Sequence, residues 1–198
     1  MTEVPQRAAR PADVPRIAEL MRWSVEELFP RFHDARETAS AAVHLTEPDT
    51  VLIADGTYFV HEVDGRIVAC GGWSKRDKLY TGSGDRPGDS RLLDPATEPA
   101  RVRAMFVHAD FARRGLGRAI LTSCVDAASA AGFRSLTLMA TLPGVPLYRA
   151  FGFREVRRAR IPLPDGVVLD GVAMELGLPA TPASPAGPGG TADRPGRR

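Results

Sequence analysis

Residues 102–120 constrain the fold more than any other part of the chain, because a strand, a glycine-rich turn and a helix follow one another there without a spacer. In the first part, apolar residues alternate with arginine or methionine, which is typical of a half-buried strand. The apolar positions of that alternation are Val102, Ala104 and Phe106. From Leu116 onward, apolar residues recur at helical spacing up to Gly132, a residue suited to the left-handed end of a helix. The pattern predicts a strand that leads directly into a long helix.

The glycines of this stretch lie at the start of the predicted helix, where an anion meets little hindrance. The first backbone N–H groups of a helix have no intrahelical partner and carry partial positive charge. Gly115 and Gly117 have no side chain to keep an anion away, and Arg113, Arg114 and Arg118 add full charges. The turn therefore predicts a phosphate or pyrophosphate site. A surface turn that merely caps the helix is the alternative.

Spacing separates the kinds of phosphate-binding turn. A P-loop needs GxxxxGK followed by Ser or Thr, which the chain lacks, and a dinucleotide fingerprint needs a third glycine where Ile120 stands. The remaining pattern, Arg-Arg-Gly-x-Gly between a strand and a long helix, resembles the acetyl-CoA pyrophosphate turn of the GNAT superfamily of N-acetyltransferases. Gly115 and Gly117 match it, but Ala112 occupies the position of the usual Gln or Arg, and Arg113 follows one residue later. The resemblance thus implies that backbone amides, together with arginines displaced by one residue, bind the pyrophosphate.

Other segments resemble the same superfamily. Tyr148 lies four residues before the pair Gly152 and Phe153, as does the tyrosine on the helix after the fifth strand in that family. Residues 6–21 resemble its first strand and first helix. The resemblance spans about residues 6–177.

The resemblance implies the α/β (mixed α+β) class, with a single GNAT-like domain over residues 1–177. Its central sheet is expected to be mixed and mostly antiparallel, splayed between the fourth and fifth strands and flanked by helices. Residues 57–73 are predicted to form a hairpin joined by Asp64 and Gly65, a type I′ turn signal. Residues 178–198 are rich in Pro and Gly and are expected to be a disordered tail, because they cannot bury enough apolar surface to fold.

The resemblance also implies a reaction, in which an amine attacks the thioester of acetyl-CoA directly while the enzyme orients two substrates and stabilises an oxyanion. Backbone groups freed by a bulge in the fourth strand, at Phe106 and Val107, are expected to contact the pantetheine and the thioester. Tyr148 is the expected general acid, because a phenol with a pKa of about 10 can protonate a departing thiolate. The expected coenzyme-binding residues are Phe106, Val107, Arg113, Arg114, Gly115, Leu116, Gly117 and Arg118.

The general base is less clear, because strand four carries Arg101 and Arg103 where some relatives of this superfamily present a glutamate. The candidates are Glu26, Glu27, His33 and His108. Removal of the proton through ordered water is the alternative.

Positive charge is concentrated in residues 101–160, which hold eleven arginines against three acidic residues. Such an excess suits the pyrophosphate and 3′-phosphate of coenzyme A. A nucleic-acid partner is not expected, because no aromatic residues alternate with the arginines and no helix-turn-helix, zinc or RNP pattern is present. Residues 1–100 hold twelve basic and seventeen acidic residues, which favours a cationic acceptor such as a polyamine, an aminoglycoside or a basic amino-acid derivative.

The main hypothesis is therefore an acetyltransferase that acts on the primary amine of a small molecule, with acetyl-CoA as cosubstrate. The alternatives are a non-catalytic acyl-CoA-binding or regulatory module on the same fold, and an acetyltransferase for protein N-termini or lysines. A homodimer stays open, because dimers are common among such domains.

Several features are expected to be absent. No apolar run approaches the roughly 20 residues of a membrane helix and no secretory signal is evident, so a cytoplasmic protein without membrane contact is expected. No metal is expected, because His44 and His61 lack the spacing of a metal pair. Cys70 and Cys124 are expected to be buried and unbridged.

Residues 75–99 are polar and glycine-rich, which predicts a long loop before the strand at 102–107. A loop of this length inside a compact domain is often functional. It is expected to be either a substrate lid, with Asp94 and Glu98 near the acceptor site, or a surface insertion.

Overall fold

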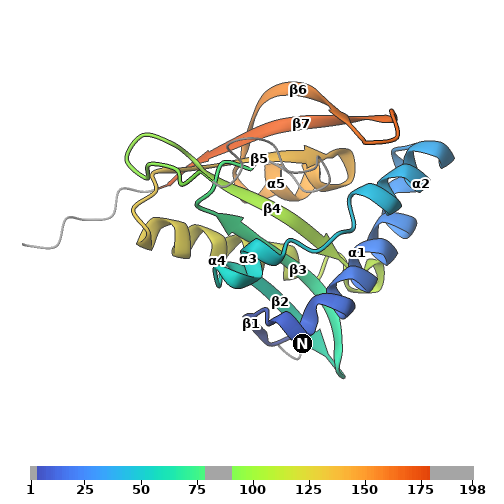
Figure 1. The fold of residues 1–198 in the computed structure, drawn as a ribbon, viewed down its shortest axis with the longest axis horizontal. Helices are drawn as coiled ribbons and strands as arrows, with labels where there is room; N and C mark the ends of the chain where they lie inside the picture. The colour runs from blue at the N-terminus through green and yellow to red at the C-terminus, as the bar shows by residue number, and fades with distance from the viewer. Residues whose placement is uncertain (1–3, 79–90, 179–198) are drawn as a thin grey trace, which may run out of the picture.

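The computed structural model describes residues 4–78 and 91–178, which form a mixed seven-stranded sheet with helices on both faces (Figure 1). The strand order is β1-β2-β3-β4-β5-β7-β6. In this sheet β4 and β5 are parallel and the other neighbours are antiparallel. The strands are β1 Gln6–Ala8, β2 Tyr58–Val63, β3 Arg66–Ser74, β4 Ala100–Val107, β5 Ser135–Thr141, β6 Arg154–Pro162 and β7 Val168–Gly177. The predicted fold class is confirmed.

Helices cover the two faces of this sheet. The α-helices are α1 Val14–Leu28, α2 Ala35–His44, α3 Thr50–Ala54, α4 Leu116–Ala130 and α5 Val145–Phe151. Short 3-10 turns lie at Pro11–Asp13, Phe29–Arg31, Ala109–Phe111 and Leu142–Gly144. In β3, Ala69 belongs to the core that contains Ile120 of α4, whereas the next residue, Cys70, belongs to the core that contains Ile17 of α1. Because successive strand residues point to opposite faces, α1 and α4 lie on opposite sides of the sheet (Figure 1).

Turn signals in the sequence correspond to turns in the structure. Asp64 and Gly65 join β2 to β3 with φ values of 48° and 76°, as a type I′ turn requires. Gly132 follows α4 with a φ of 89°, and Gly152 follows α5 with a φ of 122°. Glycine adopts these values without steric cost, which is why it marks the helix ends.

The regular alternation predicted for β4 is interrupted by a bulge. The register with β3 shifts between Cys70 and Gly72, where one residue of β3 faces two residues of β4, Ala104 and Met105. The extra residue reverses the side to which the following side chains point. Val102 therefore packs in the α4 core and Ala104 packs against the α1 core, so the prediction that the apolar residues share one face is wrong.

Strands β4 and β5 stay together at their starts and separate toward their ends. Their parallel pairing joins Ala100 to Leu136 and Arg101 to Thr137. Beyond these pairs β4 continues to Val107 while β5 runs off at an angle, as Figure 1 shows. The predicted splay between the fourth and fifth strands is thus confirmed.

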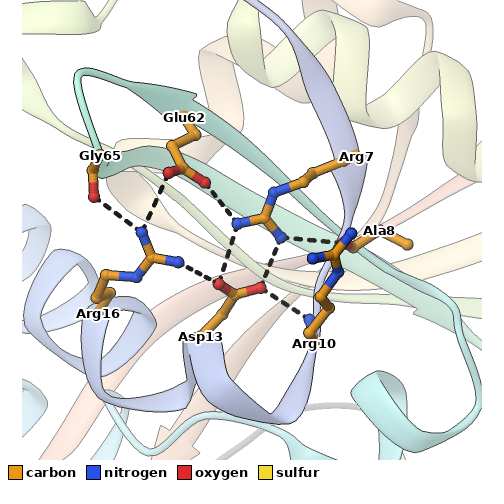
Figure 2. A network of polar contacts seen from close by, with 7 residues as sticks. All are labelled: Arg7, Ala8, Arg10, Asp13, Arg16, Glu62 and Gly65. Carbon is orange, nitrogen blue, oxygen red and sulfur yellow. Dashed lines mark hydrogen bonds and ion pairs between the residues drawn. The ribbon is translucent and has the colours of Figure 1, made fainter.

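A network of charged groups ties the first strand to the sheet and to α1 (Figure 2). The Asp13 carboxylate accepts hydrogen bonds from the Arg7 guanidinium at 2.6 and 3.0 Å, and also from Arg16. The Glu62 carboxylate of β2 accepts from the same two arginines at 2.5 and 3.2 Å, and Arg16 donates to the C=O of Gly65 at 2.8 Å. The network therefore joins β1, the start of α1 and the β2–β3 hairpin.

Other sequence predictions have mixed outcomes. Residues 179–198 of the predicted tail and residues 79–90 of the predicted loop lie outside the described residues. Cys70 and Cys124 are buried and unbridged, as predicted. Within the described ranges, none of the helices is both long and apolar enough to span a bilayer.

Candidate functional site

The turn between β4 and α4 leaves the first N–H groups of α4 without a side-chain partner. Arg113 and Gly115 have positive φ values, 62° and 86°. No side chain caps the start of α4, and the N–H of Ala119 donates to the C=O of Gly115 at 2.9 Å as the helix begins. The N–H groups of the first helical turn, at residues 116–118, precede that bond and point out of the helix end. An anion placed there would meet several N–H groups at once.

Gly117 lets this helix end approach its neighbours closely. A Cβ atom at Gly117 would lie 2.8 Å from Cδ2 of Leu147 in α5 and 3.7 Å from Cγ2 of Val107 in β4. The start of α4 thus lies between the end of β4 and α5, at the open end of the splay. A Cβ atom at Gly115 would meet nothing within 4 Å, so glycine is favoured there by its φ alone.

The three arginines of the turn have different surroundings. Arg113 and Arg114 are exposed, and the Arg114 guanidinium lies 5.0 Å from the centre of the Phe111 ring. The Arg118 guanidinium lies 5.4 Å from the centre of the Phe151 ring and donates to a backbone C=O of α5 at 3.4 Å. Arg118 is therefore directed toward the end of α5, while Arg113 and Arg114 supply exposed positive charge at the turn.

Phe106 and Val107 present their backbones to opposite edges of β4. Phe106 pairs with Cys70 of β3, and the N–H of His108 donates to the C=O of Val68 at 2.9 Å. Because backbone groups alternate between the two edges of an antiparallel strand, the N–H and C=O of Val107 point away from β3 and into the splay. Of these two predicted residues, Val107 is the one whose backbone faces the space between β4 and β5.

Tyr148 lies on α5 and is buried in the core shared with α4. Its ring meets Phe153 edge-on with 5.8 Å between centroids, and a Cβ atom at Gly144 would lie 2.9 Å from its Cε2 atom. Burial raises the pKa of the Tyr148 phenol above its ordinary value, with a smaller contribution from Cys124. The hydroxyl is therefore protonated at neutral pH and available as a donor.

His108 connects α1 to the turn that precedes α4. Its ring stacks on Trp23 with 3.6 Å between centroids and meets Phe111 edge-on at 5.7 Å. Its Nδ1 accepts from the N–H of Asp110 at 3.3 Å, and its Nε2 lies 3.4 Å from the Arg66 guanidinium. Burial lowers the pKa of His108, which favours the neutral ring at pH 7. Among the predicted bases, His108 is placed beside the turn.

The other predicted bases divide between two places. Glu27 is exposed on α1. It is close enough to His108 to raise the pKa of His108 slightly, but burial lowers that pKa by more. Glu26 and His33 line a hollow of about 500 Å³ between α1 and α2. His33 is buried there, with its Nδ1 3.3 Å from the Glu37 carboxylate. The structure thus brings Glu27 near His108 and places Glu26 and His33 in a separate hollow.

A second hollow, of about 420 Å³, lies beside the start of α5. Residues of β6 and β7 form its walls, together with Phe32, which is 47% exposed. Charged residues of both signs line it: Arg149, Glu155, Arg158 and Asp170. This hollow offers space for a polar molecule near α5.

A buried ion pair joins β4 to the start of α3. The Nη2 atom of Arg103 lies 3.0 Å from the Asp49 carboxylate, and both side chains are almost inaccessible to solvent. The Asp49 side chain also accepts from the N–H of Leu52 at 3.3 Å, as a helix N-cap. Sequence reasoning missed this ion pair, because Arg103 is far from Asp49 along the chain.

Asp94 and Glu98 precede β4, at the opposite end of that strand from the turn. Glu98 accepts from Arg91 at 2.7 and 2.9 Å, and Asp94 accepts from Thr97 at 2.9 Å. Both carboxylates are thus engaged within the loop. Among residues 4–78 and 91–178, no His, Cys, Asp and Glu side chains form a group of three or more that could hold a metal ion.

Comparison with protein families identifies the acetyltransferase (GNAT) family, whose model matches residues 17–153, more than half of the chain. No curated protein sequence matches the chain.

Solved structures of N-acetyltransferases share the fold. The GCN5-related N-acetyltransferase from Rhodopseudomonas palustris has a TM-score of 0.68 at 18% identity, over 90% of this chain and 98% of that chain. YncA, a putative acetyltransferase from Salmonella typhimurium solved with acetyl-CoA, has a TM-score of 0.56 at 18% identity, over 94% and 99%. The ribosomal-protein-S18-alanine N-acetyltransferase from Escherichia coli has a TM-score of 0.56 at 18% identity, over 92% and 99%.

Proposed function

Because the chain belongs to the GNAT acetyltransferase family, we propose that it transfers an acetyl group from acetyl-CoA to the primary amine of a small molecule. The observation that carries the proposal is the uncapped, glycine-containing start of α4 at the open end of the β4–β5 splay. That arrangement supports the binding of a pyrophosphate beside the place where β4 and β5 separate. The acetyl-CoA present in the YncA structure supports the choice of donor.

The donor's phosphates would bind at the turn. The N–H groups of Leu116, Gly117 and Arg118 supply the partial positive charge, and the Arg113 and Arg114 side chains supply full charges. The pantetheine would then run between β4 and β5, where the backbone of Val107 can bond to it as a missing strand partner would. The Phe106 side chain packs against the core that contains Ile17 of α1.

The chemistry needs few protein groups. The acceptor nitrogen forms a bond to the thioester carbonyl carbon, the carbon–sulfur bond breaks, and the leaving sulfur takes a proton. The Tyr148 phenol, which burial keeps protonated at neutral pH, supplies that proton. The proton lost by the amine passes to neutral His108 or to ordered water. Burial keeps His108 unprotonated and therefore able to accept it.

The acceptor class is the finer part of the proposal. Acidic residues outnumber basic ones in residues 1–100, which contain α1 and α2, so a cationic amine is favoured. The hollow beside α5 has two basic and two acidic residues on its walls, so it offers space for a polar acceptor and does not itself select a cationic one. A protein N-terminus is the competing acceptor, because the structurally similar E. coli enzyme acetylates an alanine of a ribosomal protein.

The test measures coenzyme thiol release from acetyl-CoA with a panel of polyamines, aminoglycosides, basic amino-acid amides and a peptide with a free N-terminal alanine. We expect turnover with at least one small cationic amine and a decrease in kcat of about 100-fold in Tyr148→Phe, because general acid catalysis is worth that much. The Kd for acetyl-CoA, measured by calorimetry, should stay unchanged in the variant.

Three outcomes would contradict parts of this proposal. Acetyl-CoA binding without thiol release for any amine would indicate a non-catalytic acyl-CoA module. Turnover with the peptide alone would replace the small molecule with a protein acceptor. Full kcat in Tyr148→Phe would remove Tyr148 as the general acid.

A further inference from the structure

Ala104, in the bulge of β4, has a backbone conformation that needs support. Its φ is 53°, a left-handed value that residues with a side chain rarely adopt within a strand. The bulge lies between the start of β4, which pairs with β5, and the end of β4, which does not. Ala104 therefore lies in the part of β4 that has already separated from β5.

Tyr58 makes the contact that holds it. The Tyr58 side chain is completely buried, and its hydroxyl donates to the C=O of Ala104 at 2.8 Å. The Tyr58 hydroxyl oxygen also lies 3.2 Å from the Sγ atom of Cys70. Tyr58 belongs to β2, so its side chain reaches β4 across the intervening strand β3.

Two glycines of β3 make that reach possible. A Cβ atom at Gly72 would lie 2.4 Å from the C=O oxygen of Thr57 and 2.8 Å from Cδ2 of Tyr58, so any larger residue there would clash with the chain before β2 and with the ring. A Cβ atom at Gly71 would lie 2.0 Å from the Sδ atom of Met105, so the side chain of the second bulge residue also occupies glycine space. Gly71 and Gly72 thus leave space for the Met105 side chain of the bulge and for the Tyr58 ring that contacts the bulge.

The hydrogen bond fixes the orientation of one peptide group. No peptide bond among the described residues is cis, so the N–H of Met105 points opposite to the C=O of Ala104. Tyr58 packs in the α1 core. The N–H of Met105 is therefore directed away from that core, and the Met105 side chain packs against the core that contains α4.

We propose that Tyr58 is a positioning residue: its hydroxyl holds the Ala104–Met105 peptide in the orientation that opens β4 from β5 and readies that stretch of β4 for the acyl-pantetheine arm of the donor. The inference rests on the proposed function, since it assumes that acetyl-CoA occupies the splay. Tyr58 itself touches neither substrate and acts through the β4 backbone.

The test compares two ligands that differ in the part that would reach the splay. Adenosine 3′-phosphate 5′-diphosphate contains the phosphates of coenzyme A but lacks pantetheine, whereas acetyl-CoA contains both. In Tyr58→Phe we expect the Kd for acetyl-CoA to rise about fivefold to tenfold, the scale of one lost hydrogen bond, and the Kd for the fragment to stay unchanged. If Tyr58 had a purely structural role, Tyr58→Phe would weaken the binding of both ligands equally or of neither.

Two further variants sharpen the comparison. Thr137→Val removes another hydroxyl that donates to a backbone C=O, that of Met174 at 3.1 Å, between β5 and β7. It should leave the binding of both ligands unchanged. Ala104→Gly, placed in the Tyr58→Phe background, should restore acetyl-CoA affinity, because glycine adopts a positive φ without the supporting bond.

The results separate the two proposals. If the wild-type protein binds the fragment and acetyl-CoA with the same Kd, the acyl-pantetheine arm adds no affinity. The proposed donor site between β4 and β5 is then wrong. If the wild type prefers acetyl-CoA and folded Tyr58→Phe keeps that preference, only the role of Tyr58 is overturned. Should Tyr58→Phe not fold, the NMR signal of the Tyr58 hydroxyl proton in the wild type decides: it should shift on addition of acetyl-CoA and not of the fragment, and an unchanged signal would overturn the inference.

Discussion

At the scale of single residues, Asp13 shows how one carboxylate can organise its surroundings. Its side chain is 3% exposed, and it accepts hydrogen bonds from Arg7, from Arg16 and from the N–H of Arg10 at 2.8 Å. The Arg7 guanidinium, more than the other donors, holds the pKa of Asp13 well below its usual range. Asp13 is therefore charged throughout the neutral range and stabilises the folded state only while it is charged.

We expect Asp13→Asn to lower the free energy of unfolding by about 2 kcal/mol at pH 7, the size of lost charge-assisted hydrogen bonds. Urea unfolding measures this free energy. The control is Glu19→Gln, an equal change of charge at an exposed site on α1, which should lower the free energy of unfolding far less. Because the folded pKa is depressed, the contribution is complete above the unfolded value of about 4 and is lost as the pH falls toward the folded one. A deficit that did not shrink below pH 4 would show that the charge is not the cause.

At the scale of elements, the start of α4 concentrates positive charge where β4, α4 and α5 meet. The helix end contributes N–H groups, and Arg113 and Arg114 contribute exposed charges next to them. Arg118 differs, because it is directed toward the end of α5. The element as a whole, rather than the third arginine, should therefore determine phosphate affinity.

The double substitution Arg113→Ala and Arg114→Ala should raise the Kd for coenzyme A about tenfold at low ionic strength. The matched control is Arg157→Ala with Arg160→Ala, which removes two exposed arginines from β6 and should leave the Kd unchanged. Calorimetry at increasing salt concentration should show that the Kd values of the wild type and of the Arg113/Arg114 variant approach each other, because salt screens exposed charges. Equal effects of both pairs would mean that net charge, not the turn, attracts the coenzyme.

At the scale of the whole molecule, the stability of the fold should depend on pH through its buried histidines. Burial lowers the pKa of both His61 and His108. His61 lies on β2, where its Nδ1 is 3.0 Å from the C=O of Val4, and His108 lies at the end of β4. Protonation of either ring therefore favours the unfolded chain.

We expect the free energy of unfolding to be nearly constant above pH 7 and to fall as the pH drops below about 6.5, the unfolded pKa of histidine. The sign follows because the unfolded state binds more protons than the folded state between the two pKa values. Thermal unfolding between pH 8 and pH 5 measures the slope, and His61→Gln should reduce it. A flat profile over that range would contradict the burial of these rings.

The sequence predicts features that depend on neighbours in the chain. Gly132 and Gly152 mark helix ends, Asp64 and Gly65 mark a hairpin, and Gly115 marks the start of α4, because each depends on the φ preferences of adjacent residues. The splay and the general position of Tyr148 follow from resemblance to a family, not from local physics.

Contacts between distant segments are decided by the tertiary structure alone. The bulge at Ala104 reverses the face of the β4 residues after it, and its support comes from Tyr58, two strands away. Asp49 reaches Arg103, and Trp23 reaches His108, only because α1, α3 and β4 are packed together. The physical reason is that turn and helix signals arise from backbone sterics within a few residues, whereas buried partners are selected by packing, which a linear pattern does not record. The amino-acid sequence by itself thus determined the elements and the glycine-containing turn before α4; the tertiary structure decided which side chains support the strand that leads into that turn.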